Sequence, residues 1–265
     1  MKPLIVITSY NRADELGRTL AALEETTDLH GVDLVVVDNG SGNGTVDMLC
    51  RWRESHTHFG NTHVLLLPSN IGCPRALNKA LELYRQPGQP VVKLDNDVEM
   101  LTVGWVDKVA SALARLQDWE GRNVAMIGAN YPGVLEGRLL MTEENVGFSR
   151  LLHHVAVVIG HCVWHTGPFM DAVGYFDVLS PEHLYGFEDL LLSCKAGAMD
   201  WRMFVWEGWS IRNIQRHSAL GRERQNGHVA QMRSLYNERR QAILAGETLW
   251  TGADGQPVTR MEEDS

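Results

Sequence analysis

The first half of the chain alternates short apolar runs with amphipathic stretches. Each apolar run is continuous rather than alternating in polarity, which is typical of strands that are covered on both faces, as in a parallel sheet. We therefore predict five such strands, at positions 3–8, 33–38, 63–68, 90–95 and 123–128.

The stretches between these runs have helical spacing. In the first of them Leu16, Leu20 and Leu23 recur at the spacing that places side chains on one helix face. Strand–helix alternation of this kind predicts an α/β fold with a doubly wound, mainly parallel sheet. The helices are expected at positions 13–25, 46–52, 74–84 and 104–116.

The second half is less regular. Residues 130–165 have the composition of loops and short strands, and 187–197 is typical of a helix that Gly197 ends. A strand is expected at 203–207, and an Arg-rich helix after position 221. The tail at 246–265 is acidic and poor in apolar residues, so we expect it to be loosely ordered.

Composition narrows the class of protein. The 265 residues are 44% hydrophobic and 22% charged, which is ordinary for one globular unit. The four cysteines are widely spaced and form no CxxC pair, so a disulfide framework is not expected. No apolar run approaches the roughly 20 residues that span a bilayer, and the first apolar run is interpreted as a core strand rather than a secretory signal. We expect a cytoplasmic protein.

Charge is unevenly distributed. The net charge is -9, but the segment 212–240 holds seven Arg, no Lys and two acids, a net charge of +5. The rest of the chain therefore carries −14. Such an Arg-rich segment could bind a polyanion, or it could be a solvated helix face.

A polar cluster follows each of the first four predicted strands. In an open α/β sheet ligands bind at the carboxyl ends of the strands, so these clusters are expected to line one site. They lie at positions 8–12, 38–42, 69–72 and 95–97.

The last of these clusters carries the clearest chemistry. Asp95 and Asp97 lie one residue apart at the end of a buried strand, where their charges repel unless a cation is near. Hard ions such as Mg²⁺ and Mn²⁺ take oxygen ligands and often bridge to phosphates. Neither GxGxxG nor GxxxxGK[ST] is present, so NAD binding and P-loop chemistry lose their usual support. A zinc pair of His161 and His165 is disfavoured because the flanking residues are typical of a strand.

Six segments together resemble a known family. They cover roughly residues 3–220, and in order they resemble the family 2 inverting glycosyltransferases of GT-A fold. The segments are ITSYNR, VVVDNGSGNGT, NIGCPRALNKAL, LDNDVE, GHCVWHTGPFMDAVGYFD and GFEDLLLSCKAG.

The resemblance implies a site for a nucleotide-diphosphate sugar, most simply a UDP-sugar, in the half of the domain at 1–130. The nucleotide base would be bordered by Thr8, Tyr10 and Arg12 and would form a hydrogen bond with Asp38. Three further side chains would lie near the ribose or diphosphate: Asn70, Arg75 and Asn78. Of these, Asn78 is displaced from its position in the family pattern.

The resemblance also implies the catalytic groups. Asp95 and Asp97 would bind the ribose and a Mn²⁺ or Mg²⁺ ion, with His217 near the metal or diphosphate. The half of the domain at 131–245 would bind the acceptor and supply the base, Asp189, with Glu188 beside it. Acids in a first helical turn also complement the helix dipole, which is the alternative interpretation of that pair.

The acceptor stays open. We expect a hydroxyl of a soluble glycan, with hydroxymethylated bases in DNA as the alternative that the Arg-rich segment raises. A non-catalytic nucleotide-sugar-binding module on the same fold is the alternative of another class. A nucleotidyltransferase would also use paired acids, but it would need a Gly-rich basic loop where this chain has SYNR.

Overall fold

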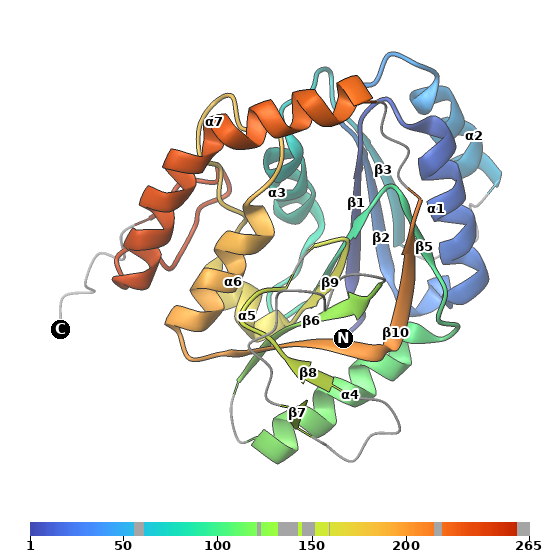
Figure 1. The fold of residues 1–265 in the computed structure, drawn as a ribbon. Coiled ribbons are helices and arrows are strands. Elements are labelled where there is room, and N and C mark those ends of the chain that lie inside the picture. The colour runs from blue at the N-terminus through green and yellow to red at the C-terminus, as the bar shows by residue number, and fades with distance from the viewer. Residues whose placement is uncertain are drawn as a thin grey trace.

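The computed structural model describes residues 1–55, 61–120, 123–131, 143–144, 152–158, 160–214 and 219–258. A single mixed sheet runs through the middle of the molecule, with helices on both faces (Figure 1). Its strand order is β3-β2-β1-β4-β9-β6-β10-β8-β7, with β5 paired to β10. Among the described helices, none is long and apolar enough to cross a bilayer.

The first four strands of this order are parallel, and each corresponds to a strand that was predicted from an apolar run in the sequence. They are β3 (Asn61–Leu66), β2 (Asp33–Asp38), β1 (Leu4–Ser9) and β4 (Val91–Asp95). The antiparallel strand β9 (Cys162–His165) then lies between β4 and β6 (Val124–Asn130). The prediction of a mainly parallel sheet is confirmed, because β10 (Arg202–Asn213) again runs parallel to β6.

Three short strands complete the sheet. The strand β8 (Leu152–His154) pairs with β10 and with β7 (Glu143–Glu144). The third, β5 (Val98–Met100), follows β4 after a two-residue turn and pairs antiparallel with the end of β10. That pairing brings residues 211–213 beside the acidic turn.

The helices divide between the two faces, which makes the sheet doubly wound. One face is covered by α1 (Ala13–Thr26), α2 (Thr45–Ser55) and α4 (Trp105–Glu120). The other is covered by α3 (Cys73–Tyr84), α5 (Gly167–Val173) and α6 (Glu188–Ala198). A short 3-10 helix, η1 (Leu29–Gly31), precedes β2, and α7 (Ala219–Leu244) packs against α6.

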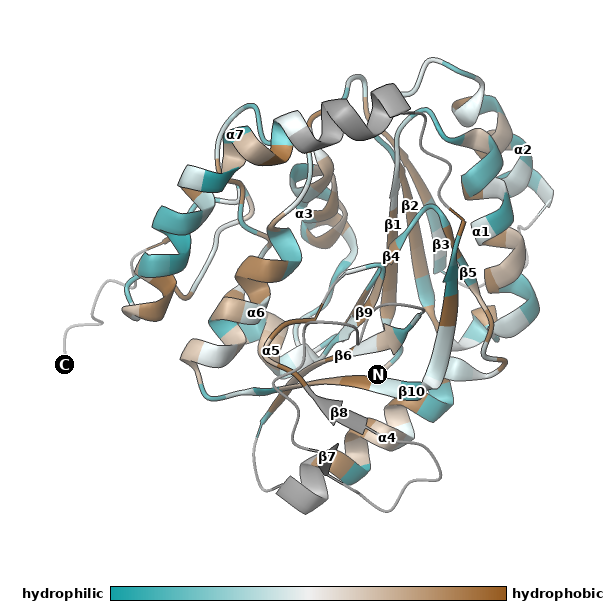
Figure 2. Ribbon diagram, in the orientation of Figure 1, coloured by the Kyte–Doolittle hydropathy of each residue, from teal (hydrophilic) through white to brown (hydrophobic). Residues whose placement is uncertain are grey.

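Each central strand contributes to both cores. Ile5 and Ile7 of β1 belong to the core under α1, whereas Leu4 and Val6 belong to the core under α3. This two-sided burial is why the apolar runs are continuous in the sequence. Figure 2 shows the same arrangement, with hydrophobic strands inside and mixed polarity on the covering helices.

The expectation of a loosely ordered tail is wrong for residues 246–258. Thr251 is fully buried, and it forms a bridge with Gly174 and another with Pro257. The backbone N–H of Val178 donates to the carbonyl of Gly255. The acidic composition of this segment gives no sign of these contacts, because the groups that hold it lie far away in the sequence. Residues 259–265 lie outside the described part.

A buried ionic network fastens this tail to the helices. Asp177 lies 2.7 Å from the Lys195 ammonium and 2.6 Å from the Arg239 guanidinium. The Lys195 ammonium also donates to the Thr251 hydroxyl at 2.6 Å. Asp177, Lys195 and Thr251 are all fully buried. Removing the one anion would leave two cations without a counter-charge.

We expect Asp177→Asn to lower the free energy of unfolding by about 3–5 kcal/mol, because breaking a buried pair leaves an uncompensated charge. Lys195→Met should cost less, since Asp177 keeps Arg239 as its partner. Chemical denaturation of both variants, with unchanged m-values, measures the difference. Equal stabilities would contradict this account of the network.

Candidate active site

The loops after β1 and β2 are tied together at the carboxyl edge of the sheet. The Asn11 side-chain carbonyl accepts from the Gly42 N–H at 2.8 Å, and the Ser41 hydroxyl accepts from the Asn11 N–H at 2.8 Å. Asn11 adopts a left-handed backbone with φ 56°, which Asn tolerates better than most residues. The first two predicted polar clusters therefore do meet.

The loop after β3 joins the same edge. The Asn39 amide donates to the Asn70 side chain at 3.0 Å, and its carbonyl accepts from the Ile71 N–H at 3.0 Å. Gly40 has φ 78°, and a Cβ there would lie 2.4 Å from the carbonyl carbon of Ser69. Only glycine allows the two loops to approach this closely. Asn70, which was expected near the ribose or diphosphate, holds this junction together.

Asp38 lies at the bottom of this junction. It is 1% exposed, and its Oδ2 accepts from the Ser41 N–H at 2.9 Å. Its Oδ1 is buried and has no hydrogen-bond partner among the described residues. A buried carboxylate oxygen without a donor is costly, so this atom is suited to accept from a ligand N–H.

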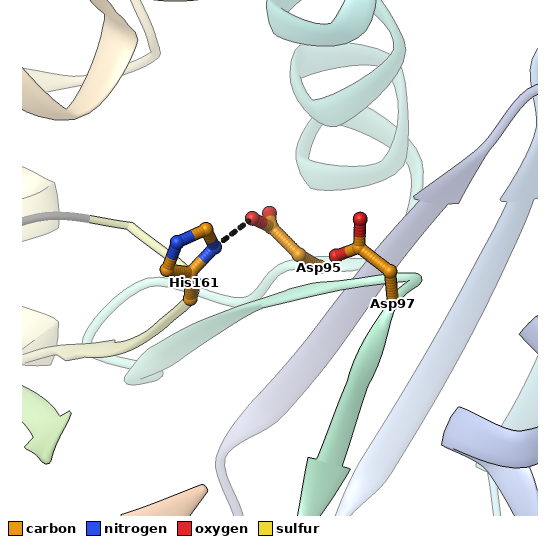
Figure 3. Close-up of side chains that lie close together, drawn as sticks. All are labelled: Asp95, Asp97 and His161. Atoms are coloured by element: carbon orange, nitrogen blue, oxygen red, sulfur yellow. Dashed lines mark hydrogen bonds and ion pairs between the residues drawn. The ribbon is translucent and has the colours of Figure 1, made fainter. Parts of the chain in front are cut away.

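The acidic turn at the end of β4 forms a three-residue cluster with His161, the residue just before β9. One ligand atom from each of Asp95, Asp97 and His161 lies within 4.8 Å of the others. Figure 3 shows the Asp95 carboxylate between the imidazole and Asp97, with the His161 Nδ1 3.0 Å from Asp95 Oδ2. The Asn96 amide fixes the turn by donating to the Thr8 carbonyl at 2.8 Å.

The two acids differ in environment. Burial raises the pKa of Asp95, but the Lys93 ammonium and His161 outweigh it and hold that pKa below its usual value. Burial and the neighbouring Asp95 raise the pKa of Asp97, against the Arg12 guanidinium 2.9 Å away. Burial lowers the pKa of His161, yet its bond to Asp95 raises it above the usual value. Two carboxylates and an imidazole form a donor set that suits a divalent cation such as Mn²⁺.

Lys93 lies under this cluster. Its ammonium is buried and lies 3.2 Å from Asp95, 3.0 Å from Asp189 and 3.5 Å from Glu188. It also donates to the Gly160 carbonyl at 2.9 Å. Burial lowers its pKa, but the three carboxylates raise it well above its usual value, so the lysine is charged. A cation thus links the predicted metal acids to the predicted base.

Asp189 lies in the first turn of α6, after Phe187, whose φ of 69° turns the chain into the helix. Burial raises its pKa to about 6, with Glu188 adding to the rise and Lys93 opposing it. Its Oδ1 is buried with no hydrogen-bond partner among the described residues. A carboxyl group with this pKa can exchange a proton near neutral pH.

Tyr10 and Thr8, which are expected to border the nucleotide base, lie at the same edge of the sheet. Tyr10 is 44% exposed, directly after β1. The Thr8 hydroxyl faces the Cys73 sulfur at 3.3 Å. Arg12, which is expected to border the nucleotide base, is paired with Asp97.

Arg75 and Asn78 form hydrogen bonds with the protein's own backbone. Arg75 donates to the carbonyls of Ser180 and Pro181, at 2.6 and 3.1 Å, and so holds the loop before α6. Asn78 is 1% exposed, and its amide exchanges two hydrogen bonds of 2.8 Å with the backbone of Phe176. Both were expected near the ribose or diphosphate; their polar atoms are occupied by the protein itself.

His217 falls at 215–218, outside the described residues. Two further candidates were not predicted from the sequence, because His161 was considered only as half of a disfavoured zinc pair and Lys93 was not singled out. The available signals were a lysine inside an otherwise apolar strand and a histidine just before another strand. Neither signal says that the two strands are neighbours.

Comparisons with known proteins agree with this architecture. The model of glycosyl transferase family 2 matches residues 4–163, more than half of the chain. The mannosyltransferase PcManGT from Pyrobaculum calidifontis, solved with GDP-Man and Mn²⁺, is 17% identical with a TM-score of 0.61, over 93% of this chain and 75% of that one. No protein of curated function matches the sequence significantly.

Two further solved structures are similar. S. aureus TarS 1-349 in complex with UDP is 17% identical with a TM-score of 0.59, over 93% of this chain and 70% of that one. GalNAc-T7 with UDP, GalNAc and Mn²⁺ is 14% identical with a TM-score of 0.62, over 89% of this chain. The match spans only 50% of the GalNAc-T7 chain. At these identities the likeness concerns the fold, whereas the family match covers the acidic cluster itself, and the chain belongs to glycosyl transferase family 2, a family of glycosyltransferase enzymes.

Proposed function

We propose that this glycosyltransferase uses a divalent cation to transfer a sugar from a UDP-sugar to an acceptor hydroxyl, inverting the anomeric carbon. The observation that carries the proposal is the link through Lys93. One buried ammonium contacts both Asp95, in the cluster suited to a metal, and Asp189, the acid suited to be the base. Stabilisation of the leaving group and transfer of the proton can thus take place at one edge of the sheet.

The acidic cluster supports the metal part. Asp95, Asp97 and His161 offer the oxygen and nitrogen atoms that Mn²⁺ accepts, and two of the similar structures were solved with Mn²⁺. A bound divalent cation supplies Lewis-acid stabilisation of the departing diphosphate. Arg12 would neutralise part of the charge of Asp97 and keep that side chain oriented.

Asp38 supports the nucleotide part. Its unpartnered Oδ1 can accept the N3–H of a uracil ring, while its Oδ2 stays fixed by Ser41. A guanine base also presents N–H donors, and one similar structure holds GDP-Man, so GDP is the competing nucleotide. The UDP found with two of the similar proteins favours the uracil choice.

Asp189 supports the inverting part. As a carboxylate it can take the proton of the acceptor hydroxyl while that oxygen attacks the anomeric carbon from the side opposite the leaving diphosphate. Glu188 does not need to touch the acceptor. Its buried charge raises the pKa of Asp189, which makes Asp189 a better base at neutral pH.

A glycan is the better supported acceptor. A DNA acceptor would draw on the Arg-rich segment 212–240, but Arg212 is paired with Glu99 and Arg239 with the buried Asp177. Charges already neutralised in this way contribute little to phosphate binding. The side chains of residues 215–226 lie outside the described part.

Metal dependence is tested with Asp97→Asn and His161→Ala. Both should lower the affinity for Mn²⁺ by at least about 10-fold, because each loses a ligand, by analogy with the 10–100-fold losses seen even for outer-shell changes. Mn²⁺ binding followed by electron paramagnetic resonance, beside transfer assays in EDTA, gives the measurement. Full transfer in EDTA would reject the metal.

The nucleotide assignment is tested by thermal shift. UDP should raise the melting temperature of the wild type, as a ligand of the native state must. Asp38→Ala should weaken UDP binding by about 10–100-fold, the worth of a hydrogen bond to a charged group. Asp33→Ala, at the opposite end of the same strand, is the control that should keep the shift. A larger shift with GDP than with UDP would replace the donor.

The base is tested by its pH dependence. Asp189 acts when deprotonated, so kcat should rise as the pH rises through about 6 and level off above it. Asp189→Asn should keep donor affinity and lose at least about 100-fold in kcat, the usual worth of a general base. Glu188→Gln should be milder and should move the profile to lower pH, because it removes a charge that raises the pKa of Asp189. A flat profile in the wild type would count against Asp189.

A further inference from the structure

We propose that Lys93 is a positioning residue that, together with Gly160, holds the Asp189 carboxylate in the place from which it accepts the acceptor's proton. This rests on the proposed function, and it concerns a residue that neither coordinates a metal nor contacts a substrate. The inference comes from geometry and from the chemistry of a buried ammonium.

The donors of Lys93 are fully used. An ammonium has three N–H donors. They match three oxygen atoms, the Gly160 carbonyl at 2.9 Å, Asp189 Oδ2 at 3.0 Å and Asp95 Oδ1 at 3.2 Å. Lys93 is 3% exposed, so water does not compete for these donors. Each carboxylate therefore has a direct contact to an ammonium that is itself buried.

Gly160 provides the second constraint. A Cβ at this position would lie 1.8 Å from Asp189 Oδ2, which means that the carboxylate rests directly on the glycine backbone. The glycine also lends its carbonyl to Lys93. Asp189 is thus held between an ammonium and a bare backbone, and only glycine leaves room for it.

Three acids depend on this one cation. Asp95, Glu188 and Asp189 all lie within 3.5 Å of the Lys93 ammonium. Replacing the lysine with an apolar side chain would leave these charges facing one another in a buried region, and each buried unpaired charge is costly. The Asp189 side chain, which is partly exposed, could relieve this repulsion by rotating away from Gly160 toward solvent. A misplacement of about 1 Å in a catalytic group can cost about 100-fold in rate.

The experiment compares Lys93→Met with the wild type. We expect kcat at saturating Mn²⁺ to fall about 100-fold while the dissociation constant for UDP, measured without a divalent cation, stays within about 3-fold, because the proposed contact to the nucleotide base is Asp38. In Lys93→Ala, added ethylammonium should restore part of kcat by occupying the site of the ammonium. A merely structural lysine would not give such rescue.

The chain offers a matched control. Lys195 is an equally buried lysine that is paired with a buried aspartate, but it lies in the ionic network of the tail. Lys195→Met should lower stability and leave kcat of the folded protein unchanged. A kcat in Lys93→Met within about 3-fold of the wild type overturns the proposal, and so does an equal kcat loss in Lys195→Met.

Two further measurements keep the outcomes separate. If Lys93→Met does not fold, Gly160→Ala tests the same contact from the other side: kcat should fall with UDP affinity kept, and an unchanged kcat overturns the proposal. A crystal structure of the lysine or the glycine variant should show the Asp189 carboxylate moved from position 160. If the wild type transfers no sugar, the proposed function fails, and this structure still decides whether Lys93 positions Asp189.

Discussion

The burial of one ammonium group organises the active edge of this protein. Lys93 lies in β4, the strand at which the parallel half of the sheet meets β9, between the buried Val92 and Leu94, and a charge there is tolerated only because three carboxylates and a carbonyl surround it. The carboxylates in turn require the ammonium. The acids from β4 and from α6 can share a small buried volume only because the ammonium is present.

The same constraint explains why distant segments converge. Asp95 at the end of β4, Gly160 before β9 and Asp189 at the start of α6 lie far apart in the sequence. Each nevertheless contributes an oxygen atom that accepts a hydrogen bond from Lys93. Because β9 runs antiparallel between β4 and β6, it brings His161 to the end of β4. The sheet topology therefore supplies the third potential ligand beside the two acids.

The fold could be predicted because its signal is local. Continuous apolar runs such as Asp33–Asp38 indicate burial on both faces, and helical spacing such as Leu16, Leu20 and Leu23 indicates which face is covered. The edge residues Asp38, Asp95 and Asp97 could be found for the same reason, since each lies at the end of a strand or just after it. His161 and Lys93 could not, because their importance depends on which strands are neighbours. The family resemblance placed Arg75 and Asn78 near the ribose or diphosphate, and it could not show that both side chains form hydrogen bonds with the backbone of residues 176–183.

The packing of Thr251 has a consequence for how the chain is made. Residues 174–178 and Lys195 are synthesised before residue 251, so the Lys195 ammonium can donate a hydrogen bond to the Thr251 hydroxyl only once the later segment has been made. Folding of this part of the second core therefore depends on contacts between segments that lie far apart in the sequence, and it cannot be completed before Thr251 is in place.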